Sequence, residues 1–475
     1  MSRLTQKVFQ SAAFFFLLTG SFAQAQSSQQ DEWREILQFG IDSQVETLLP
    51  QLEQSGVTDM DDPLVFRFLA SRGDDLREAI IEYFQRRDSD ALVEPVRTLL
   101  LAEQEPSDQV IRAAASYLSS QAAEIDDQLL DLFSEFADDS GVLTATVAIQ
   151  AIGASSSAGA VERLIDLYEE QQNSDVRASI LRALGQTGSE QALPLLTSIA
   201  EDEFEQSALR HYATESIGRI RSPESVELLT GLLSSPDSVL RAYATLALGF
   251  YPPETSASAL TDALLDSFWR VRVAALEGLS EQANAAAVPA IAFKARRDPE
   301  RPVRTEAIET LGSIATPEAL EALSEIARNN RLAETERMLS LTQLIAHDAG
   351  MFEELLTEIV EEEWEREGSR VLDTIGKELS TSGEPRLAEL YLRFLEHPNF
   401  VIRVYAIRAL GAARITAEQS RLKTLADENE GLIRTTALAA LERMGITYEP
   451  SEEEAVDEQS PDEGSSGDPD AQTDW

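Results

Sequence analysis

One arginine recurs along the middle of the chain at a nearly constant spacing. Arg177, Arg210, Arg241, Arg272 and Arg304 follow one another at steps of 33, 31, 31 and 32 residues, and each opens a similar segment. Self-similarity at such a period is typical of stacked repeat proteins. Because a single unit of this size cannot bury its apolar face alone, the spacing predicts a stack of similar units.

Each unit reads as two short amphipathic helices. In "RASILRALG", apolar Ile180 and Leu184 follow Arg177 at helical spacing, and Gly185 comes next. A glycine at this point is typical of the left-handed residue that ends a helix. A polar turn then leads to a second amphipathic run, "EQALPLLTSIAE". The equivalent glycines of other units are Gly218, Gly249, Gly312 and Gly411.

The repeat extends over most of the chain. Copies start as early as Arg77 and continue to Arg403 and beyond, with Ala145 replacing one arginine and a degenerate copy near Arg370. The sequence therefore predicts an all-α solenoid over residues 26–448, of about twelve stacked helix pairs with a period of 31–35 residues. Its first part, residues 31–60, is expected to form a capping repeat.

The repeat units resemble a known family. Their Val-Arg, Ala and Leu-Gly pattern, in "DVRASILRALG", "PVRTEAIETLG" and "FVIRVYAIRALG", is similar to the short HEAT-like repeat of the phycobilisome-lyase type. The resemblance implies that the second helix of each pair lines the concave face and binds partners. Bilin lyases share the repeat, but the repeat itself carries no catalytic group.

The first 25 residues read as an export signal. They combine a positive start, the apolar run "AAFFFLL" and the small-residue sequence "AQA". The apolar run is shorter than a spanning helix requires, so stable membrane insertion after cleavage is not expected. The chain has no cysteine, which leaves neither disulfides nor a cysteine-linked lipid anchor. We expect an exported protein, periplasmic or secreted.

The chain is strongly acidic, with a formal net charge of −45. Such a charge repels polyanions, so nucleic acid and anionic membranes are poor candidate partners. Only four of the 39 basic residues are lysines, which fits a saline habitat and a GC-rich genome equally well. Residues 449–475 contain no basic residue and almost no apolar one, which predicts a disordered acidic tail that could attract cations weakly.

No motif for catalysis or cofactor binding stands out. Deoxyhypusine hydroxylases resemble this fold and bind a di-iron centre through repeated His-Glu pairs, whereas His211, His347 and His397 are followed by Tyr, Asp and Pro. The sequence also lacks a Gly-rich phosphate loop and a GxSxG turn. We therefore predict no catalytic residue, no metal site, no cofactor and no enzyme.

The repeated arginines could act in two ways. They could form a ladder of anion ligands, or each guanidinium could pair with carboxylates or carbonyl groups of the adjacent unit. Asp175 and Asp237 precede Arg177 and Arg241 by two and four residues. This proximity favours a structural role for Arg177, Arg210, Arg241, Arg272, Arg304 and Arg403.

Two irregular segments are candidate partner-binding sites. "MFEELLTEIVEEEWEREG" predicts an over-long acidic helix, residues 351–368, in which Trp364 stands among Glu361, Glu362 and Glu365. Trp364 is either an interface anchor or a residue that packs across the degenerate repeat.

The second segment, "FKARRDPERPVR", is the densest basic cluster of the chain. It contains Lys294, Arg296, Arg297 and Arg301, and Trp269 lies one repeat upstream. The cluster could dock an acidic partner or the chain's own tail, or it could be a surface balanced by Asp298 and Glu300.

The sequence thus favours a non-catalytic scaffold of the bacterial cell envelope that binds other proteins along the concave face of a solenoid. Two alternatives remain open. One is a lyase-like or other HEAT-fold enzyme or enzyme accessory, and the other is an envelope spacer.

Overall fold

The computed structural model describes residues 29–448, apart from residues 103–106, 122, 124, 140, 156 and 158. The predicted signal, residues 1–25, and the predicted acidic tail, residues 449–475, lie outside this range. Throughout the described residues the regular structure is helical, with no strand. Among the same residues, no helix has both the length and the apolar composition needed to cross a membrane.

The chain divides into two compact units. The division falls between Ser256 and Ala257, within α15 (Pro253–Ala263). In the first unit, the first helices of successive pairs are α2 (Asp42–Ser55), α4 (Asp74–Arg86), α6 (Asp108–Ser120), α8 (Val142–Ala154), α10 (Ser174–Thr187), α12 (Ser207–Ile220) and α14 (Ser238–Gly249). The second helices are α3 (Asp61–Ala70), α5 (Val93–Leu100), α7 (Asp127–Asp139), α9 (Ala160–Glu170), α11 (Leu193–Glu201) and α13 (Ser225–Leu232). Residues 29–39, ahead of α2, are also helical.

The second unit continues the same alternation. Its first helices are α16 (Trp269–Glu281), α18 (Arg301–Ile314), α20 (Glu334–Asp348), α22 (Arg370–Ser382), α24 (Phe400–Ala412) and α26 (Gly431–Arg443). Its second helices are α17 (Val288–Arg297), α19 (Pro317–Arg328), α21 (Glu353–Glu363), α23 (Ala388–Leu395) and α25 (Gln419–Glu428). Short 3₁₀ turns precede several second helices in both units: η1 (Asp90–Leu92), η2 (Glu190–Ala192), η3 (Ala285–Ala287), η4 (Ala349–Phe352), η5 (Pro385–Leu387) and η6 (Thr416–Glu418).

Each predicted repeat therefore corresponds to one pair of helices in the structure. The copy near Arg370 is a regular pair, α22 and α23, in which Asp373 takes the fourth helical position that arginine holds elsewhere. The stretch expected as a capping repeat, residues 31–60, contains α2, and its second helix α3 follows immediately. Continuity of one solenoid across the unit boundary stays a prediction.

Side-chain caps set the starts of many first helices. The side chains of Asn173 and Asp237 accept hydrogen bonds from backbone N–H groups in the first turns of α10 and α14. Ser107 and Ser369 do the same for α6 and α22. Such caps satisfy donors that have no partner within the helix, so they fix the first residue of these four helices.

The repeated glycines do not end the helices, and the prediction of a left-handed cap at these positions is wrong. Gly185, Gly218, Gly312 and Gly411 lie inside first helices, and Gly249 is the last residue of α14. The left-handed residues at the ends of α10 and α12 are Gly188, with φ of 66°, and Arg221, with φ of 58°.

The glycines instead allow close approach of consecutive first helices. A Cβ on Gly185 would lie 2.7 Å from the Cα of Ser216 in α12, and one on Gly218 would lie 2.7 Å from the Cα of Ala247 in α14. Gly411 faces Ala440 of α26 in the same way. Only hydrogen fits at these contacts, which is why glycine is required.

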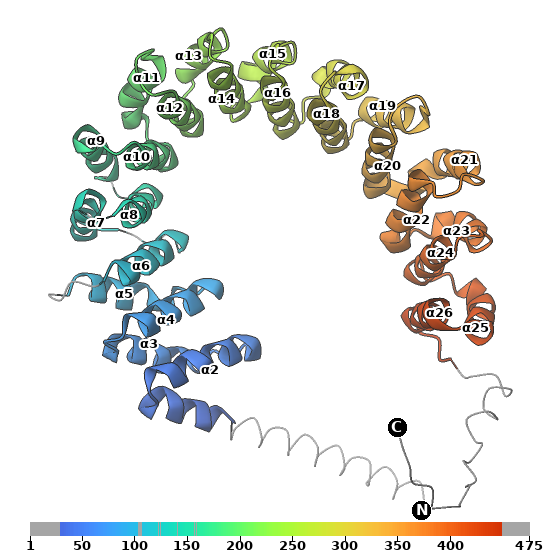
Figure 1. Ribbon diagram of the computed structural model, residues 1–475, viewed down its shortest axis with the longest axis horizontal. Helices are drawn as coiled ribbons and strands as arrows, with labels where there is room; N and C mark the ends of the chain where they lie inside the picture. Colours follow the sequence, from blue (N-terminus) through green and yellow to red (C-terminus); the bar gives the residue numbers. More distant parts are fainter. Residues whose placement is uncertain are drawn as a thin grey trace, which may run out of the picture. The chain divides into compact units, whose positions relative to one another are not determined.

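These contacts determine which helices form the inner layer. Neighbouring first helices contact one another more extensively than neighbouring second helices do. Figure 1 shows that, within each unit, the even-numbered first helices lie on the concave side and the odd-numbered second helices on the convex side. The expectation that second helices line the concave face is therefore wrong, because the small residues bring the first helices closer together.

The glycine contact makes a prediction about stability. In Gly218→Ala the methyl group would overlap the backbone of α14, and overpacking of this kind costs about 1–3 kcal/mol. The higher helix propensity of alanine returns about 1 kcal/mol at most. We expect a lower thermal midpoint. Gly231→Ala in α13, where nothing lies within 4 Å of the added methyl, is the matched control and should raise the midpoint. A higher midpoint for both variants would contradict the close-packing argument.

Candidate partner-binding surface

The repeated arginines occupy the fourth position of their first helices and bond backwards along the stack. The guanidinium of Arg210 donates to the carbonyl of Ala200 at 3.1 Å, and that of Arg337 donates to the carbonyl of Ala327 at 2.9 Å. Both acceptors lie at the end of the preceding second helix, where carbonyl groups lack helical partners. Arg241 similarly donates to the Ser235 carbonyl at 3.0 Å.

Several of these arginines also pair with a carboxylate. Arg177 lies 3.1 Å from Glu205, and Arg304 lies 2.8 Å from Glu336. Arg272 binds both carboxylate oxygens of Asp298 through two nitrogens, at 2.8 and 2.6 Å. These groups are used inside the stack, which leaves little room for an external anion. Arg403 is half-buried at the same helical position.

The deepest such pair joins Arg337 to Glu363, the last residue of α21. The two side chains are 2% and 3% exposed, and their closest atoms are 2.7 Å apart. Burial alone would raise the pKa of Glu363. Hydrogen bonds from Ser369 and Arg337, together with the charges of Arg337 and Arg366, hold that pKa below its ordinary value.

The Arg337–Glu363 pair makes the free energy of unfolding depend on pH. A carboxyl group whose pKa is lowered by folding stabilises the folded state above its unfolded pKa, near 4.5, and loses that contribution as the pH falls through the folded value. Glu363→Gln should therefore cost about 3 kcal/mol at pH 7, because it leaves Arg337 buried without its closest carboxylate. The difference from wild type should shrink towards pH 3.

Denaturant unfolding at both pH values measures this effect. The control is Glu358→Gln, which removes the exposed pair that Glu358 forms with Arg328 at 2.9 Å and should cost at most about 1 kcal/mol. Equal costs for the two variants would show that burial of the Arg337–Glu363 pair is unimportant.

The Trp364 segment differs from the predicted long helix. The 3₁₀ turn η4 leads into α21, which ends at Glu363, so Trp364 lies in the following turn. The expected helix over residues 351–368 is therefore too long. Glu363 is bonded to residues on both sides of this turn, Arg337 and Ser369, which fixes the end of α21 there.

Trp364 already has partners within the protein. The guanidinium of Arg393 in α23 lies over the Trp364 ring at 3.7 Å, and the His397 ring meets it edge-on at 4.7 Å. Glu361 pairs with Arg393 at 3.0 Å, while Glu365 is exposed. Glu362 accepts from Asn330 at 3.0 Å. A cavity of about 590 Å³ borders Trp364 and His397.

The basic cluster is split in space. Lys294 lies 3.5 Å from the buried Asp298, and Arg296 pairs with Glu325 at 2.7 Å. Arg297 and Arg301 are exposed. Trp269, the first residue of α16, is half-buried with the guanidinium of Arg270 above its ring at 5.2 Å. Two of the four basic residues thus pair with carboxylates, and the other two are exposed.

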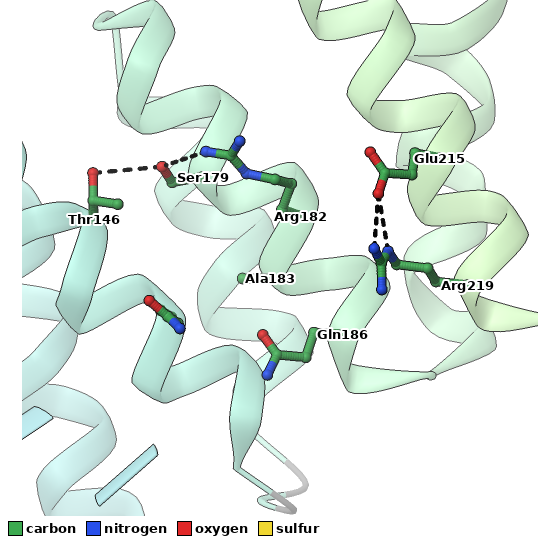
Figure 2. A pocket seen from close by; sticks show the side chains of 8 residues that line it. Thr146, Ser179, Arg182, Ala183, Gln186, Glu215 and Arg219 are labelled. Carbon is green, nitrogen blue, oxygen red and sulfur yellow. Dashed lines mark hydrogen bonds and ion pairs between the residues drawn. The ribbon is translucent and has the colours of Figure 1, made fainter. Parts of the chain in front are cut away.

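The inner layer of the first unit carries a groove that was not predicted. A cavity of about 360 Å³ crosses α8, α10 and α12, and its lining includes Thr146, Arg182, Gln186, Glu215 and Arg219. Figure 2 shows a chain of hydrogen bonds from Arg182 through Ser179 to Thr146, and the pair of Glu215 with Arg219 on the next helix.

A sequence signal for this groove does exist. Arg182 and Glu215 stand five residues after the repeated arginines Arg177 and Arg210, and Gln186 and Arg219 stand nine residues after them. These offsets lie away from the buried positions at three and seven, so polar residues there face solvent.

Aromatic side chains lie beside this groove. The Arg182 guanidinium lies 4.7 Å from the centre of the Tyr212 ring, and the His211 ring stacks on Tyr243 at 5.1 Å. His211 also pairs with Asp237 at 3.1 Å. Burial, together with the nearby Glu215, raises the pKa of Tyr243 above its ordinary value of 10.0. The result is a face of arginine and aromatic side chains, types enriched in protein interfaces.

The inner layer of the second unit carries two further grooves. One, of about 510 Å³, crosses α18, α20 and α22 and includes Arg301. The other, of about 430 Å³, crosses α22, α24 and α26 and includes Arg408 and Arg443. Each groove therefore spans three consecutive first helices, as the groove of the first unit does.

A carboxyl group in this layer, Glu306 of α18, titrates unusually. Burial, with the charges of Glu277 and Glu309, raises its pKa from 4.5 to about 7. A carboxyl with a raised folded pKa favours the folded state when protonated, so its deprotonation removes stability as the pH rises from about 4.5 to about 7.

Glu306→Gln should accordingly match wild type near pH 4.5 and exceed it in thermal midpoint at pH 8. The replacement cannot ionise, and it removes repulsion from Glu277 and Glu309. A thermal scan across this pH range is the measurement, with Glu318→Gln on the exposed face of α19 as the control that should leave the profile unchanged. A pH-independent difference would contradict the raised pKa.

The fold and these surfaces define the class, an all-α solenoid of HEAT-type helix pairs. The sequence model of the spirochaete HEAT repeat proteins matches residues 37–440, so the chain belongs to this family.

Individual relatives were also found. Deoxyhypusine hydroxylases of Mus musculus and Homo sapiens are 27% and 28% identical to the chain. These matches cover 33% and 35% of this chain and 71% and 74% of theirs.

Among solved structures, the karyopherin Kap95p in complex with RanGDP superposes with a TM-score of 0.50 at 14% identity, covering 82% of this chain and 61% of that one. Kap121p gives a TM-score of 0.42 at 13% identity, over 86% of this chain and 54% of that one. The chain thus spans about half the length of Kap121p. At this identity the likeness to Kap95p supports the fold alone.

The di-iron centre of deoxyhypusine hydroxylases, with its repeated His-Glu pairs, does not fit this chain. His211 is bonded to Asp237 and stacked on Tyr243, while both ring nitrogens of His397 are engaged by the backbone of Trp364 and Asn399. In the described part of the chain, no three His, Asp or Glu side chains are grouped to hold a metal ion.

Proposed function

We propose that the protein is a non-catalytic scaffold of the bacterial cell envelope, which binds other proteins along the inner layer of first helices. Its membership of a HEAT-repeat family supports this role. Kap95p, which has a similar fold, was solved in complex with the protein RanGDP. The export signal expected in residues 1–25 is the basis for the location.

The observation that carries the proposal is the form of the inner grooves. Each is shallow, crosses three neighbouring first helices and is lined largely by polar side chains, with volumes of about 360, 430 and 510 Å³. Within each unit, a shallow surface of this kind suits an extended protein segment better than a small substrate, which usually occupies one enclosed apolar pocket.

The deoxyhypusine hydroxylase relatives favour an alternative, a HEAT-fold enzyme or enzyme accessory. The engaged His211 and His397 argue against the iron chemistry of those relatives. A colourless, metal-free purified protein that retains a protein partner would support the scaffold, and a bound chromophore or metal would support the alternative. A third possibility, an envelope spacer, predicts no tight partner at all.

Affinity capture from cross-linked envelope extract, with the chain from Gln26 onwards as bait, tests the scaffold role. One stoichiometric partner should survive high salt. Replacing Arg182 and Gln186 with glutamate should reduce the captured partner about tenfold, which corresponds to about 1.4 kcal/mol. Both side chains line the groove of the first unit without lying in its core.

Arg163→Glu is the matched control. Arg163 is an exposed arginine on the second helix α9, where it pairs with Asp131. Its replacement should leave capture unchanged. Equal loss in both variants would place the binding surface elsewhere, and capture of nothing beyond salt-sensitive background would overturn the scaffold.

A further inference from the structure

The groove across α22, α24 and α26 differs in charge from the rest of the chain. Its lining contains two arginines, Arg408 and Arg443, and no carboxylate. Gly411 and Ala440 form part of its floor, and Leu432 at its edge is 52% exposed. The groove is therefore a basic surface with apolar parts, in a chain that holds 84 acidic and 39 basic residues.

The two arginines remain available for a ligand. Both are exposed, and within the described residues neither forms an ion pair. This contrasts with Arg272 and Arg337, which are buried against carboxylates. An arginine pair with free donors in a shallow groove is suited to carboxylate groups, because the guanidinium fork matches their geometry.

Residues 449–475 begin close to this groove in sequence, six residues after Arg443. Tyr448, the last residue that the structure describes, donates from its hydroxyl to Asp427 of α25 at 2.7 Å. Residues 449–475 follow, with eleven acidic residues and no basic one, and they include the run Glu452–Glu454.

The distances are compatible. From Tyr448, which is held at Asp427, the chain can extend about 20 Å to Glu454, and the whole of α26 is about 20 Å long. A ligand tethered by so short a link has an effective concentration on the order of millimolar, so even weak ion pairs would populate the contact.

We propose that the acidic segment 449–475 binds within its own chain, in the groove between α22, α24 and α26, with Glu452–Glu454 facing Arg408 and Arg443. This contact is independent of the scaffold role. Where the inner layer does bind a partner, the segment would compete for the last groove.

The absence of cysteine makes a direct test practical. Thr381→Cys, at the groove, and Ala455→Cys, in the segment, give the full chain two unique spin-label positions. Pulsed electron resonance should report a short-distance population. Replacing Arg408 and Arg443 with glutamate should reduce this population about fivefold, the scale of two exposed ion pairs lost. Salt at 1 M, where screening acts over about 3 Å, should reduce it as well.

The charge-matched control replaces Arg297 and Arg301 with glutamate. These arginines are exposed on and after α17 and do not line this groove, so the distances should stay unchanged. Circular dichroism checks that both double variants keep their helices. Distances that do not respond to the Arg408 and Arg443 replacements would overturn the proposal. So would a short distance that disappears on dilution with unlabelled protein, because the segment would then belong to a second copy.

Discussion

The structure depends on the contact between consecutive first helices. At this contact a glycine of one helix meets the backbone of a serine or alanine in the next, as Gly185 meets Ser216 and Gly218 meets Ala247. Because the helices approach so closely, the first helices form the concave layer of each of the two compact units, and the second helices form the convex layer. The same contact places the polar residues of three successive helices side by side, which creates the shallow grooves.

The arginine at the fourth helical position also connects neighbouring helix pairs. It joins the first helix to carbonyl groups at the end of the preceding second helix and, in several units, to a carboxylate further along. In an acidic chain this arrangement uses arginines to offset local repulsion inside the stack, most completely at Arg272 and Arg337. Arginines outside this position, such as Arg182, Arg408 and Arg443, are the ones left to line the grooves.

Membership of a HEAT-repeat family does not by itself decide between binding and catalysis. The deoxyhypusine hydroxylase relatives are enzymes. Here, two of the three histidines, His211 and His397, hold neighbouring elements together, and His347 is exposed. His397 fixes the turn at Trp364, and His211 bridges α12 to the start of α14.

Much of the fold could be predicted from the sequence, because helical periodicity and the arginine spacing are local patterns. These patterns were sufficient to predict the helix pair, the period of the repeat and the number of repeats. The sequence could not show that Gly185 and its equivalents lie inside helices. Glycine is required there because the backbone of the next first helix approaches closely. The acidic helix predicted over residues 351–368 was likewise too long, because the end of α21 depends on bonds from Glu363 to Arg337 and Ser369.

The candidate sites divide in the same way. Lys294, Arg296, Arg297 and Arg301 are close in sequence, but only Lys294 and Arg296 pair with carboxylates. Trp364 has its partners, Arg393 and His397, one repeat away. The grooves instead combine residues from three units at offsets that repeat along the chain. The sequence by itself determined the class of fold, because that class follows from a short period of apolar residues. The tertiary structure alone decided which layer is concave and which charges remain exposed, because both depend on how one helix pair packs against the next.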